Sequence, residues 1–488
     1  MPLPSPPPSP SPPIASLITD FAGLQGAFAR IKAASRQDMA PSQAHRRQRL
    51  DALEALLRDN MKALCAAVSA DFGHRSSHET QLLEIFPSLE GIRHTRRHLG
   101  TWMKPQRRSV SLWFQPARAE LRPQALGCVG IISPWNYPIY LAIGPLTAAL
   151  AAGNRAMVKM SEFTPSTAAL FAELAASYFP ADELAVVGGD HELAEAFSHL
   201  PFDHLLFTGS TAVGRLVMKA AAENLTPVTL ELGGKSPAII APDYPIAKAA
   251  ERILAGKCLN AGQTCIAPDY LFLPEGEAEN FIAAARKIVA ASYPDLQQNP
   301  NYSAIINARH AARLHGYLDD AAAHGAHIVP LVPLAEVKAN PNGPQRLAPT
   351  LILQTTESMK VMQEEIFGPL LPILTYRNIQ EALDYVNAHD RPLALYLFDR
   401  DKRRINQVLD QTIAGGVTVN DTILHIAQDD LPFGGVGPSG MGQYHGYEGF
   451  RTFSKLKPVF YQSRLNGIGL FNPPYGKLFE RLLKLLLR

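Results

Sequence analysis

Cysteine is scarce in this sequence, and its few positions restrict what the chain can do with sulfur. The 488 residues include four cysteines, Cys65, Cys128, Cys258 and Cys265, and no CxxC pair. A zinc site or a disulfide framework is therefore not expected, no metal is predicted, and the usage favours the reducing cytoplasm. We expect Cys258 to be a small buried apolar residue, because free cysteine is usually buried in folded proteins.

Long apolar runs and an excess of one charge are missing as well. No apolar run reaches the roughly 18 residues of a transmembrane helix, so no segment is predicted to cross a membrane. The net charge of +2 provides no electrostatic basis for a nucleic-acid partner. A hydrophobic fraction of 47% and a charged fraction of 18% indicate instead a soluble globular protein with two or three domains.

The two ends of the chain differ in composition from its middle. Residues 1–40 begin with MPLPSPPPSPSPP, which lacks the basic and apolar regions of a signal peptide, and we interpret them as a disordered proline-rich tail. A ligand for a proline-binding partner is the alternative. Residues 459–488 end in the amphipathic pattern LFERLLKLLLR, which is too short to cross a bilayer. We expect it to dock on its own protein or on a partner subunit, with attachment to a membrane surface as the alternative.

Between the ends, the pattern of apolar residues predicts an α/β protein. Helical spacing over residues 44–70 and 78–100 is followed by an extended arm or hairpin at 105–123. From about residue 125 to 426, short apolar strands alternate with helices. Repeated βα units of this length predict parallel, doubly wound sheets, with ligands at the carboxyl ends of the strands.

A carboxylate and a thiol stand out in residues 228–268, VTLELGGKSP…KCLNAGQTCIAP. Glu231 ends an apolar, strand-like run immediately before a Gly-Gly turn, and Cys265 follows the next helix in a Gly-Gln-Thr-Cys loop. This pairing is typical of a general base and a nucleophile that the fold brings together. The alternatives are a helix-capping or salt-bridged carboxylate for Glu231 and a buried, inert thiol for Cys265.

Two further loops carry polar groups with suitable chemistry. Asn136 lies between two prolines and two aromatic residues in PWNYP, where its amide can serve as a preorganised donor to an oxyanion. In QEEIFGP, Glu365 can hydrogen-bond a ribose and Phe367 can lie against a flat ring. An ordinary turn, with a turn-forming asparagine or a buried phenylalanine, is the alternative at each loop.

A nucleotide site is indicated by two loops that follow strands. FTGSTAVGR, at residues 207–215, opens a helix, and Gly209 lets the backbone approach a phosphate at the helix N-terminus. Lys159 and Glu162 follow another strand, where the lysine can donate to ribose hydroxyls and the carboxylate can accept from a 2′-OH while repelling a 2′-phosphate. A plain strand-to-helix turn and a solvated pair of loop residues are the alternatives.

Five motifs in these loops resemble those of one known family. PWNYP, FTGSTAVGR, LELGGKSP, GQTC and EEIFGP occur in this order between about residues 45 and 465, as in the aldehyde dehydrogenase superfamily. GQTCIAPDY and SGMGQYHGYEGFRTFS are similar to its class 3 branch, and within that branch the chain most resembles bacterial coniferyl aldehyde dehydrogenases. The resemblance implies a Rossmann-like cofactor domain, an α/β catalytic domain and a small β arm for oligomerisation.

The resemblance also implies domain boundaries and an assembly. The NAD(P)-binding domain corresponds to residues 41–231, interrupted by an arm at 104–127, and the catalytic domain to residues 232–426. Residues 427–458 are expected to complete the oligomerisation arm. Because class 3 relatives are usually dimers, a homodimer is expected.

By the same resemblance, an activity and the residues that carry it are expected. The reaction is the NAD(P)-dependent oxidation of an aldehyde, such as coniferyl aldehyde, to the carboxylic acid through a thiohemiacetal and a thioester on Cys265. Glu231 would activate water, and the Asn136 amide with the Cys265 backbone N–H would hold the oxyanion. The cofactor would be bound by Trp135, Lys159, Glu162, Gly209, Ser210, Glu365 and Phe367.

Several alternatives to this expectation stay open. Glu162 favours NAD, but class 3 relatives often accept NADP as well, and Met160 replaces the proline that many relatives have after the lysine. The substrate could be a medium- or long-chain fatty aldehyde. A cysteine hydrolase, with His310 or His445 as the partner of the thiol, and a non-catalytic structural relative are the other classes. The presence of Glu231 favours hydrolysis of the thioester over its transfer to coenzyme A.

Overall fold

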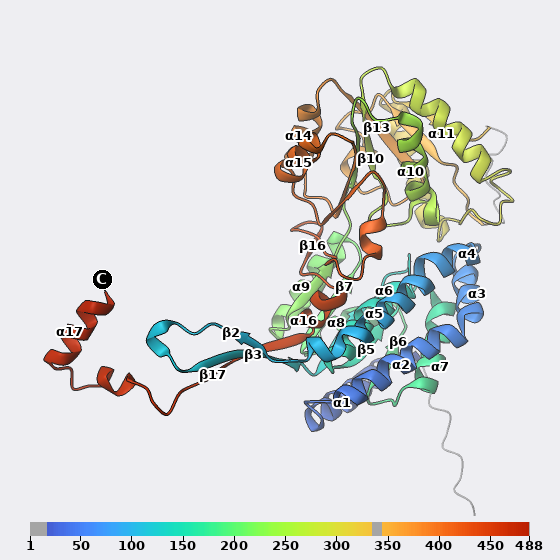
Figure 1. Cartoon of the computed structure of the whole chain (residues 1–488). Helices are drawn as coiled ribbons and strands as arrows, with labels where there is room; N and C mark the ends of the chain where they lie inside the picture. Colours follow the sequence, from blue (N-terminus) through green and yellow to red (C-terminus); the bar gives the residue numbers. More distant parts are fainter. Residues whose placement is uncertain (1–16, 334–343, 488) are drawn as a thin grey trace, which may run out of the picture.

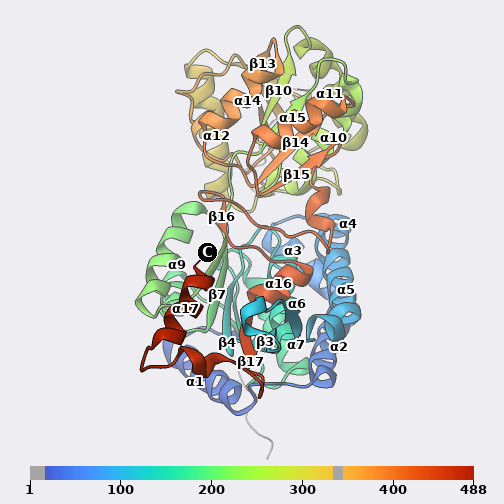
Figure 2. The ribbon, with the colours of Figure 1, turned by 60° about the vertical axis from the view of Figure 1, so that its left-hand side comes forward.

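The chain folds into two lobes and an arm. The computed structural model describes residues 17–333 and 344–487. Within these ranges, two seven-stranded sheets form the cores of a first and a second lobe, and a three-stranded sheet extends from the first lobe (Figures 1 and 2). The α/β class that the sequence predicts is confirmed.

The first lobe is a doubly wound sheet with the strand order β1-β6-β5-β4-β7-β8-β16. All neighbours are parallel except β16, which runs antiparallel to β8. The strand order reverses between β4 and β7, which is where doubly wound sheets bind ligands. The strands are β1 (Leu17–Ile18), β4 (Cys128–Ile132), β5 (Arg155–Lys159), β6 (Leu184–Val187), β7 (His204–Thr208), β8 (Val228–Glu231) and β16 (Gly440–Met441).

Helices cover both faces of this sheet, which explains why its central strands are apolar on both sides. One face packs against the helices that contribute to the larger core, and the other against α1, α8 and α9. The first group is α2 (Gln43–Asp59), α3 (Met61–Asp71), α5 (Phe86–Trp102), α6 (Tyr140–Ala152) and α7 (Pro165–Tyr178); the second is α1 (Phe21–Gln37), α8 (His191–Ser198) and α9 (Thr211–Glu223). Between α3 and α5 lie α4 (Ser77–Thr80) and a π-helical turn at Gln81–Ile85.

The prediction of a disordered tail over residues 1–40 is wrong for its second part. Helix α1 begins after Asp20, whose carboxylate accepts a hydrogen bond from the backbone of Gly23. Its apolar residues recur at the spacing of an amphipathic helix, with Leu24, Phe28 and Ile31 buried against the sheet. Burial of this stripe holds the segment in place. The proline-rich residues 1–16 lie outside the described residues.

The second lobe contains a sheet of order β11-β12-β13-β10-β9-β14-β15. Its neighbours are parallel except β11 and β12. The strands are β9 (Pro237–Ile240), β10 (Tyr270–Pro274), β11 (His327–Pro330), β12 (Thr350–Leu353), β13 (Leu370–Tyr376), β14 (Ala394–Phe398) and β15 (Gly416–Val419). Its helices are α10 (Ile246–Cys258), α11 (Ala278–Ser292), α12 (Ala308–Ala323), α13 (Lys360–Gln363), α14 (Ile379–Ala388) and α15 (Lys402–Gln411).

The arm is shorter in sequence than predicted. Its antiparallel sheet has the order β17-β3-β2 and consists of β2 (Gln106–Arg108), β3 (Arg118–Ala125) and β17 (Ser454–Tyr461). Residues 427–453, which we assigned to the arm, instead lie on the first lobe: β16 joins its sheet, and α16 (Gly446–Thr452) packs on α5 and α6. The buried aromatic residues Tyr444, Phe450 and Phe453 explain this placement.

Beyond the arm, the chain ends in α17 (Lys477–Leu486), far from both lobes in Figure 1. Its Phe479 ring packs on Phe471 and Tyr475, while Leu478 and Leu485 are exposed. The predicted amphipathic segment is therefore helical. In the part of the chain that the structure describes, no helix combines the length and the apolar character needed to cross a membrane.

Candidate active site

A pocket of about 250 Å³ contains most of the predicted site residues. Of the ten, only Lys159 and Glu162 are not in its lining. Both lobes contribute to its walls. The lining is Pro134, Trp135, Asn136, Leu141, Thr208, Gly209, Ser210, Glu231, Leu232, Gly233, Cys265, His310, Arg313, Glu365 and Phe367.

The topology of the first lobe explains one wall of this pocket. The loop with Asn136 follows β4, Gly209 follows β7, and Glu231 is the last residue of β8. Because β4, β7 and β8 are parallel neighbours, their carboxyl ends lie at the same edge of the sheet. Three motifs that are far apart in the sequence thus meet at the reversal of strand order.

The loop with Cys265 reverses direction within a few residues after α10. Asn260 and Ala261 have φ values of 51° and 52°, and Gly262 has 74°. Left-handed backbone is costly at residues other than glycine, and tertiary contacts must compensate. The side-chain amide of Gln263 supplies such contacts, because it donates to the backbone carbonyls of Asn260 (2.9 Å) and Ala304 (3.0 Å). The cysteine is therefore held by a strained, well-bonded loop.

The thiol of Cys265 shares the pocket with the carboxyl groups of Glu231 and Glu365. Burial raises the pKa of the Cys265 thiol to about 12, and the Glu365 and Glu231 carboxyls add to this effect. Burial, followed by repulsion from Asp269, raises the pKa of Glu365 to about 8. At neutral pH, Cys265 rests as a thiol. Forming the thiolate therefore requires a proton acceptor or a positive charge in the pocket.

The environment of Glu231 differs from that of a structural carboxylate. Its side chain is buried, and neither carboxyl oxygen has a hydrogen-bond partner among the described residues. Burial raises its pKa well above the ordinary value for glutamate. A helix-capping or salt-bridged carboxylate would have such partners, so these alternatives do not apply. An unpartnered carboxyl beside a thiol is able to bind and deprotonate water.

Asn136 is fixed by hydrogen bonds at both its side chain and its backbone. Its amide Nδ2 donates to the carbonyl of Gln263 over 3.1 Å. The backbone carbonyl of Asn136 accepts hydrogen bonds from the side chains of Asn260 (3.0 Å) and Arg75 (2.8 Å). An amide nitrogen carries two hydrogens, and only one is used by Gln263. Asn136 thus presents a preorganised donor in the wall of the pocket.

The remaining wall fits a dinucleotide with a nicotinamide ring. Ser210 caps the N-terminus of α9, a place that suits a pyrophosphate. The hydroxyl of Thr208 and Oε1 of Glu365 are buried without a partner among the described residues, so each can bond a ribose hydroxyl. Gly233 makes room for that carboxylate, because a Cβ there would lie 2.0 Å from Oε2 of Glu365.

Lys159 and Glu162 lie at the end of β5, beside the pocket in the sheet order. The Lys159 ammonium is buried, which lowers its pKa, and it donates to the carbonyls of Met160 (2.8 Å) and Gly189 (3.2 Å). Glu162 is exposed to solvent. Both side chains thus lie at the edge of the sheet where the adenosine half of a dinucleotide would extend from the pocket.

Two further residues line this site: Arg313, which we did not predict, and His310, which we named only as the partner of the thiol in a cysteine hydrolase. The His310 ring lies 5.0 Å from that of Trp135, and burial lowers its pKa to about 4. Arg313 donates to the carbonyls of Glu365 and Phe367, both over 3.4 Å, and so holds the EEIFGP turn. They lie one turn apart on α12, but this i, i+3 spacing is common on exposed helices and carries no functional signal by itself.

Fold and pocket together define a two-lobed oxidoreductase-like enzyme with a thiol, a carboxyl group and an amide at one site. A sequence profile described as the aldehyde dehydrogenase family matches residues 22–459. The chain belongs to this family.

Relatives and solved structures agree with this assignment. The chain is 55% identical to a probable coniferyl aldehyde dehydrogenase of Pseudomonas aeruginosa (94% of this chain, 95% of the relative). It is 50% identical to a coniferyl aldehyde dehydrogenase of a Pseudomonas species (95% and 96%). A substrate-bound structure of Staphylococcus aureus AldH superposes with a TM-score of 0.89 at 37% identity (95% and 99%). An NAD⁺ complex of a Bacillus cereus aldehyde dehydrogenase gives 0.81 at 25% identity (90% and 89%).

Proposed function

We infer that this protein oxidises an aldehyde to a carboxylic acid with a nicotinamide cofactor. The observation that carries the inference is the shared pocket of Cys265, Glu231 and Asn136, with Glu231 buried and unpartnered. A cysteine hydrolase would need a histidine to activate the thiol. The His310 ring packs on Trp135 and Phe163, and His445 bonds Tyr140. Neither arrangement supports the hydrolase.

We propose the following roles for the side chains in the reaction. The Cys265 thiol passes its proton to the Glu231 carboxylate, which releases it to solvent. The thiolate sulfur attacks the aldehyde carbon, and the carbonyl oxygen becomes an oxyanion that the Asn136 amide stabilises. A bound nicotinamide supplies an acceptor for the hydride that leaves this carbon. Loss of the hydride gives a thioester on Cys265. Glu231 then removes a proton from water, the water oxygen attacks the thioester, and the acid and the free thiol are released.

We propose NAD as the preferred cofactor. Glu162 can accept a hydrogen bond from an adenosine ribose 2′-OH and would repel a 2′-phosphate. The buried Lys159 ammonium stands beside it as a donor to the same ribose. Aromatic rings of Trp135 and Phe367, 5.3 Å apart, offer a wall for the nicotinamide. Support also comes from the NAD⁺ complex of the Bacillus cereus relative.

We propose coniferyl aldehyde, or a similar aromatic aldehyde, as the substrate. Two Pseudomonas relatives at 50% and 55% identity carry this substrate in their names. Beside the two rings assigned to the nicotinamide, the pocket is lined by Leu141 and Leu232, and this apolar lining suits an aromatic group. A medium- or long-chain fatty aldehyde is the second candidate, because an apolar lining also accepts an alkyl chain.

We propose that the protein is a cytoplasmic homodimer. Its arm ends in an exposed apolar tip, where Leu112 and Trp113 are 81% and 62% exposed. Exposed apolar clusters of this kind mark interaction surfaces. The exposed leucines of α17 lie beyond the same arm and offer a second contact for a partner subunit. The four cysteines are free, which fits a reducing compartment.

One assay tests the activity and the substrate class together. The purified chain is supplied with coniferyl aldehyde, benzaldehyde, hexanal and decanal, each with NAD and with NADP, and formation of the reduced cofactor is followed by absorbance. We expect the highest kcat/KM for coniferyl aldehyde with NAD. Turnover of the aliphatic aldehydes alone would transfer the assignment to fatty aldehydes. Absence of cofactor reduction with every aldehyde would refute the proposed function.

A further inference from the structure

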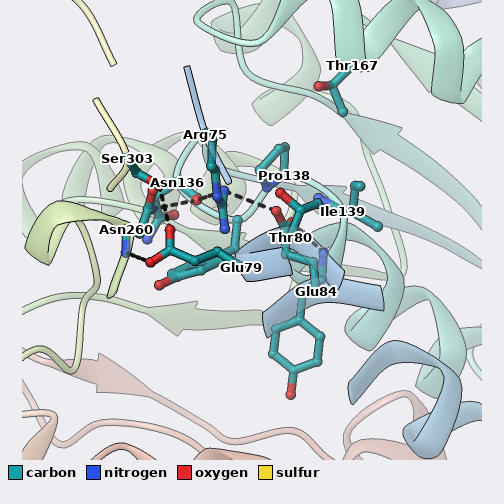
Figure 3. A network of polar contacts seen from close by, with 12 residues as sticks. Arg75, Glu79, Thr80, Glu84, Asn136, Pro138, Ile139, Thr167, Asn260 and Ser303 are labelled. Atoms are coloured by element: carbon teal, nitrogen blue, oxygen red, sulfur yellow. Dashed lines mark hydrogen bonds and ion pairs between the residues drawn. The ribbon is translucent and has the colours of Figure 1, made fainter. Parts of the chain in front are cut away.

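Arg75 lies behind the active-site loops and outside the pocket. Its side chain is buried, and its Nη1 donates to the Asn136 carbonyl over 2.8 Å. The same nitrogen lies 3.1 Å from Oε1 of Glu84 in an ion pair. Figure 3 shows the guanidinium between these two groups. Because Arg75 is absent from the lining of the pocket, it can act on the chemistry only through its neighbours.

Glu84 holds the far end of the same loop. Its Oε2 accepts from the backbone N–H groups of Ile139 (2.7 Å) and Tyr140 (3.1 Å), where α6 begins. A carboxylate is favourable at this end of a helix. The Arg75–Glu84 pair thus holds residues 136–140 at both ends, by a carbonyl at one end and by two N–H groups at the other.

The complete burial of this pair indicates a role in geometry. Both side chains have an exposure of 0%. The guanidinium also lies over the rings of Phe72 (5.2 Å) and Tyr137 (4.8 Å). A buried ion pair contributes little net stability, since the cost of removing two charges from water offsets their attraction. The directional contacts of the pair, in contrast, fix the positions of the Asn136 carbonyl and of the N–H groups of Ile139 and Tyr140.

The loop with the nucleophile is tied to the same segment. Glu79 accepts from the backbone N–H of Asn260 (3.2 Å) and from the hydroxyl of Ser303. The Asn260 amide donates to the carbonyls of Asn136 (3.0 Å) and Gln263 (3.2 Å). The Asn136 carbonyl therefore receives one donor from Arg75 and one from the loop that leads to Cys265, as Figure 3 shows in part.

We propose that Arg75 is a positioning residue for the oxyanion site. By holding the Asn136 carbonyl, it keeps the peptide in the orientation that turns the Asn136 amide toward the pocket. Arginine suits this position because its planar guanidinium holds Nη1 in a fixed direction between the carbonyl and the carboxylate, whereas a lysine ammonium is a flexible point charge. The inference rests on the proposed function, since only a reaction through an oxyanion at Cys265 needs this donor.

The test compares Arg75→Met and Arg75→Lys with the wild type in two reactions. One is oxidation of benzaldehyde with NAD, and the other is hydrolysis of p-nitrophenyl acetate without cofactor; both pass through an oxyanion at Cys265. Loss of one oxyanion donor costs on the order of 100- to 1,000-fold in kcat. We expect Arg75→Met to lose about 100-fold in kcat in both reactions and Arg75→Lys about tenfold, with the KM for NAD changed by less than about twofold.

A third reaction separates positioning from damage to the nucleophile. Iodoacetamide alkylates a thiol without forming an oxyanion, so its rate with Cys265 reports only on the thiol and its access. We expect this rate in the Arg75 variants to stay within about threefold of wild type. A loss as large as that of ester hydrolysis would show a general collapse of the site and would overturn the proposal.

A double variant tests whether Arg75 acts through Asn136. If it does, Arg75→Met should slow ester hydrolysis in the wild type but hardly at all in an Asn136→Ala background. An equal loss in both backgrounds would overturn the proposal.

The matched control is Arg49→Met. Arg49 is also buried, pairs with Glu183 (2.7 Å) and donates to the carbonyl of Asn154 (3.5 Å), but its contacts are away from the pocket. We expect it to lower the Tm without changing either kcat. If Arg75→Met does not fold, Arg75→Lys decides the matter, because wild-type rates in that variant contradict the proposal. Failure of the wild type to oxidise any aldehyde would instead refute the proposed function, while ester hydrolysis would still report on Arg75.

Discussion

The side-chain amide of Asn136 donates a 3.1 Å hydrogen bond to the backbone carbonyl of Gln263, two residues before Cys265. This bond joins the loop after β4 of the first lobe to the cysteine loop of the second. A second bond acts in parallel, between the hydroxyls of Tyr137 and Thr264 (2.7 Å). The loop with Asn136 and the loop with Cys265 are therefore held in a common frame, although they lie in different lobes.

Replacing Cys265 by alanine should abolish aldehyde oxidation. The substitution removes the sulfur that forms the bond to the aldehyde carbon, and the pocket has no other thiol. Reduction of NAD with coniferyl aldehyde measures the loss, and an unchanged Tm confirms the fold. Cys258→Ala is the matched control, since Cys258 is equally a free thiol but is buried outside the pocket. Full turnover by Cys265→Ala would show that the nucleophile has been misassigned.

Replacing Glu231 by glutamine should stall the reaction at the thioester. A carboxamide cannot take a proton from water, so hydrolysis should slow by about 100- to 10,000-fold. Rapid mixing should show a burst of about one equivalent of NADH and then a slow phase. Because burial raises the Glu231 pKa and the base form is deprotonated, hydrolysis in the wild type should accelerate as pH rises. A Glu231→Gln enzyme with wild-type turnover and the same pH profile would contradict this role.

Glu162→Gln should weaken the preference for NAD. Loss of the carboxylate removes repulsion of a 2′-phosphate and one acceptor for a ribose hydroxyl. We expect the ratio of kcat/KM for NAD over NADP to fall by about tenfold, which corresponds to about 1.4 kcal/mol. Glu173→Gln on α7 is the control, because Glu173 is also exposed but lies away from the sheet edge. An unchanged ratio would assign cofactor choice to other residues.

The protein should lose stability as the pH falls below about 6.5, the ordinary pKa of histidine. Burial lowers the pKa of His204 to about 4, so between these values the unfolded chain binds a proton that the folded chain does not. The stability present above 6.5 is therefore lost as pH falls, and burial of His310, His425 and His445 acts in the same direction. Tm measured at pH 7.5 and pH 5 should fall less in His204→Gln than in the wild type. His78→Gln is the control: His78 is exposed, and we expect the fall in Tm between pH 7.5 and pH 5 to be the same as in the wild type.

Polar substitution at the tip of the arm should dissociate the proposed dimer. Leu112→Ser combined with Phe114→Ser removes two exposed apolar groups that a partner subunit would bury. Light scattering coupled to gel filtration should show a shift from dimer toward monomer. Leu225→Ser is the control, since Leu225 is 89% exposed but lies on the first lobe. A wild-type chain that is monomeric at micromolar concentration would count against the dimer itself.

The residues that the sequence made predictable share one property: each directly follows a strand or occupies a short loop with a distinctive composition. Asn136, Gly209 and Glu231 all lie at the ends of buried strands, so the βα pattern places them at one edge. Arg75 and His310 carry no such local signal. Their partners, the Asn136 carbonyl and the Trp135 ring, come from distant parts of the chain. Contacts of this kind arise only when tertiary packing is complete.

The helix over residues 21–37 shows a different limit. Its apolar stripe is present in the sequence, with Leu24, Phe28 and Ile31 at helical spacing. The proline-rich residues before it dominated the interpretation of the whole N-terminus. Likewise, the family resemblance assigned residues 427–458 to the arm, whereas the buried rings of Tyr444 and Phe450 bind that segment to the first lobe. Local composition is a poor guide where a few apolar anchors determine the position.

The strand that ends in Glu231 is completed by a segment made much later in synthesis. β16 pairs with β8 in a register that places Gly440 opposite Glu231, and the N–H of Leu232 donates to the carbonyl of Ser439 over 3.1 Å. On the ribosome, β8 emerges about 200 residues before this partner and stands meanwhile as an open, apolar edge of the sheet. The nascent chain is thus exposed to wrong strand pairing for most of the translation of its second half. Completion of the sheet edge beside Glu231 therefore becomes one of the last events of folding, and a chain truncated before residue 440 would hold all of the proposed catalytic side chains without a finished site.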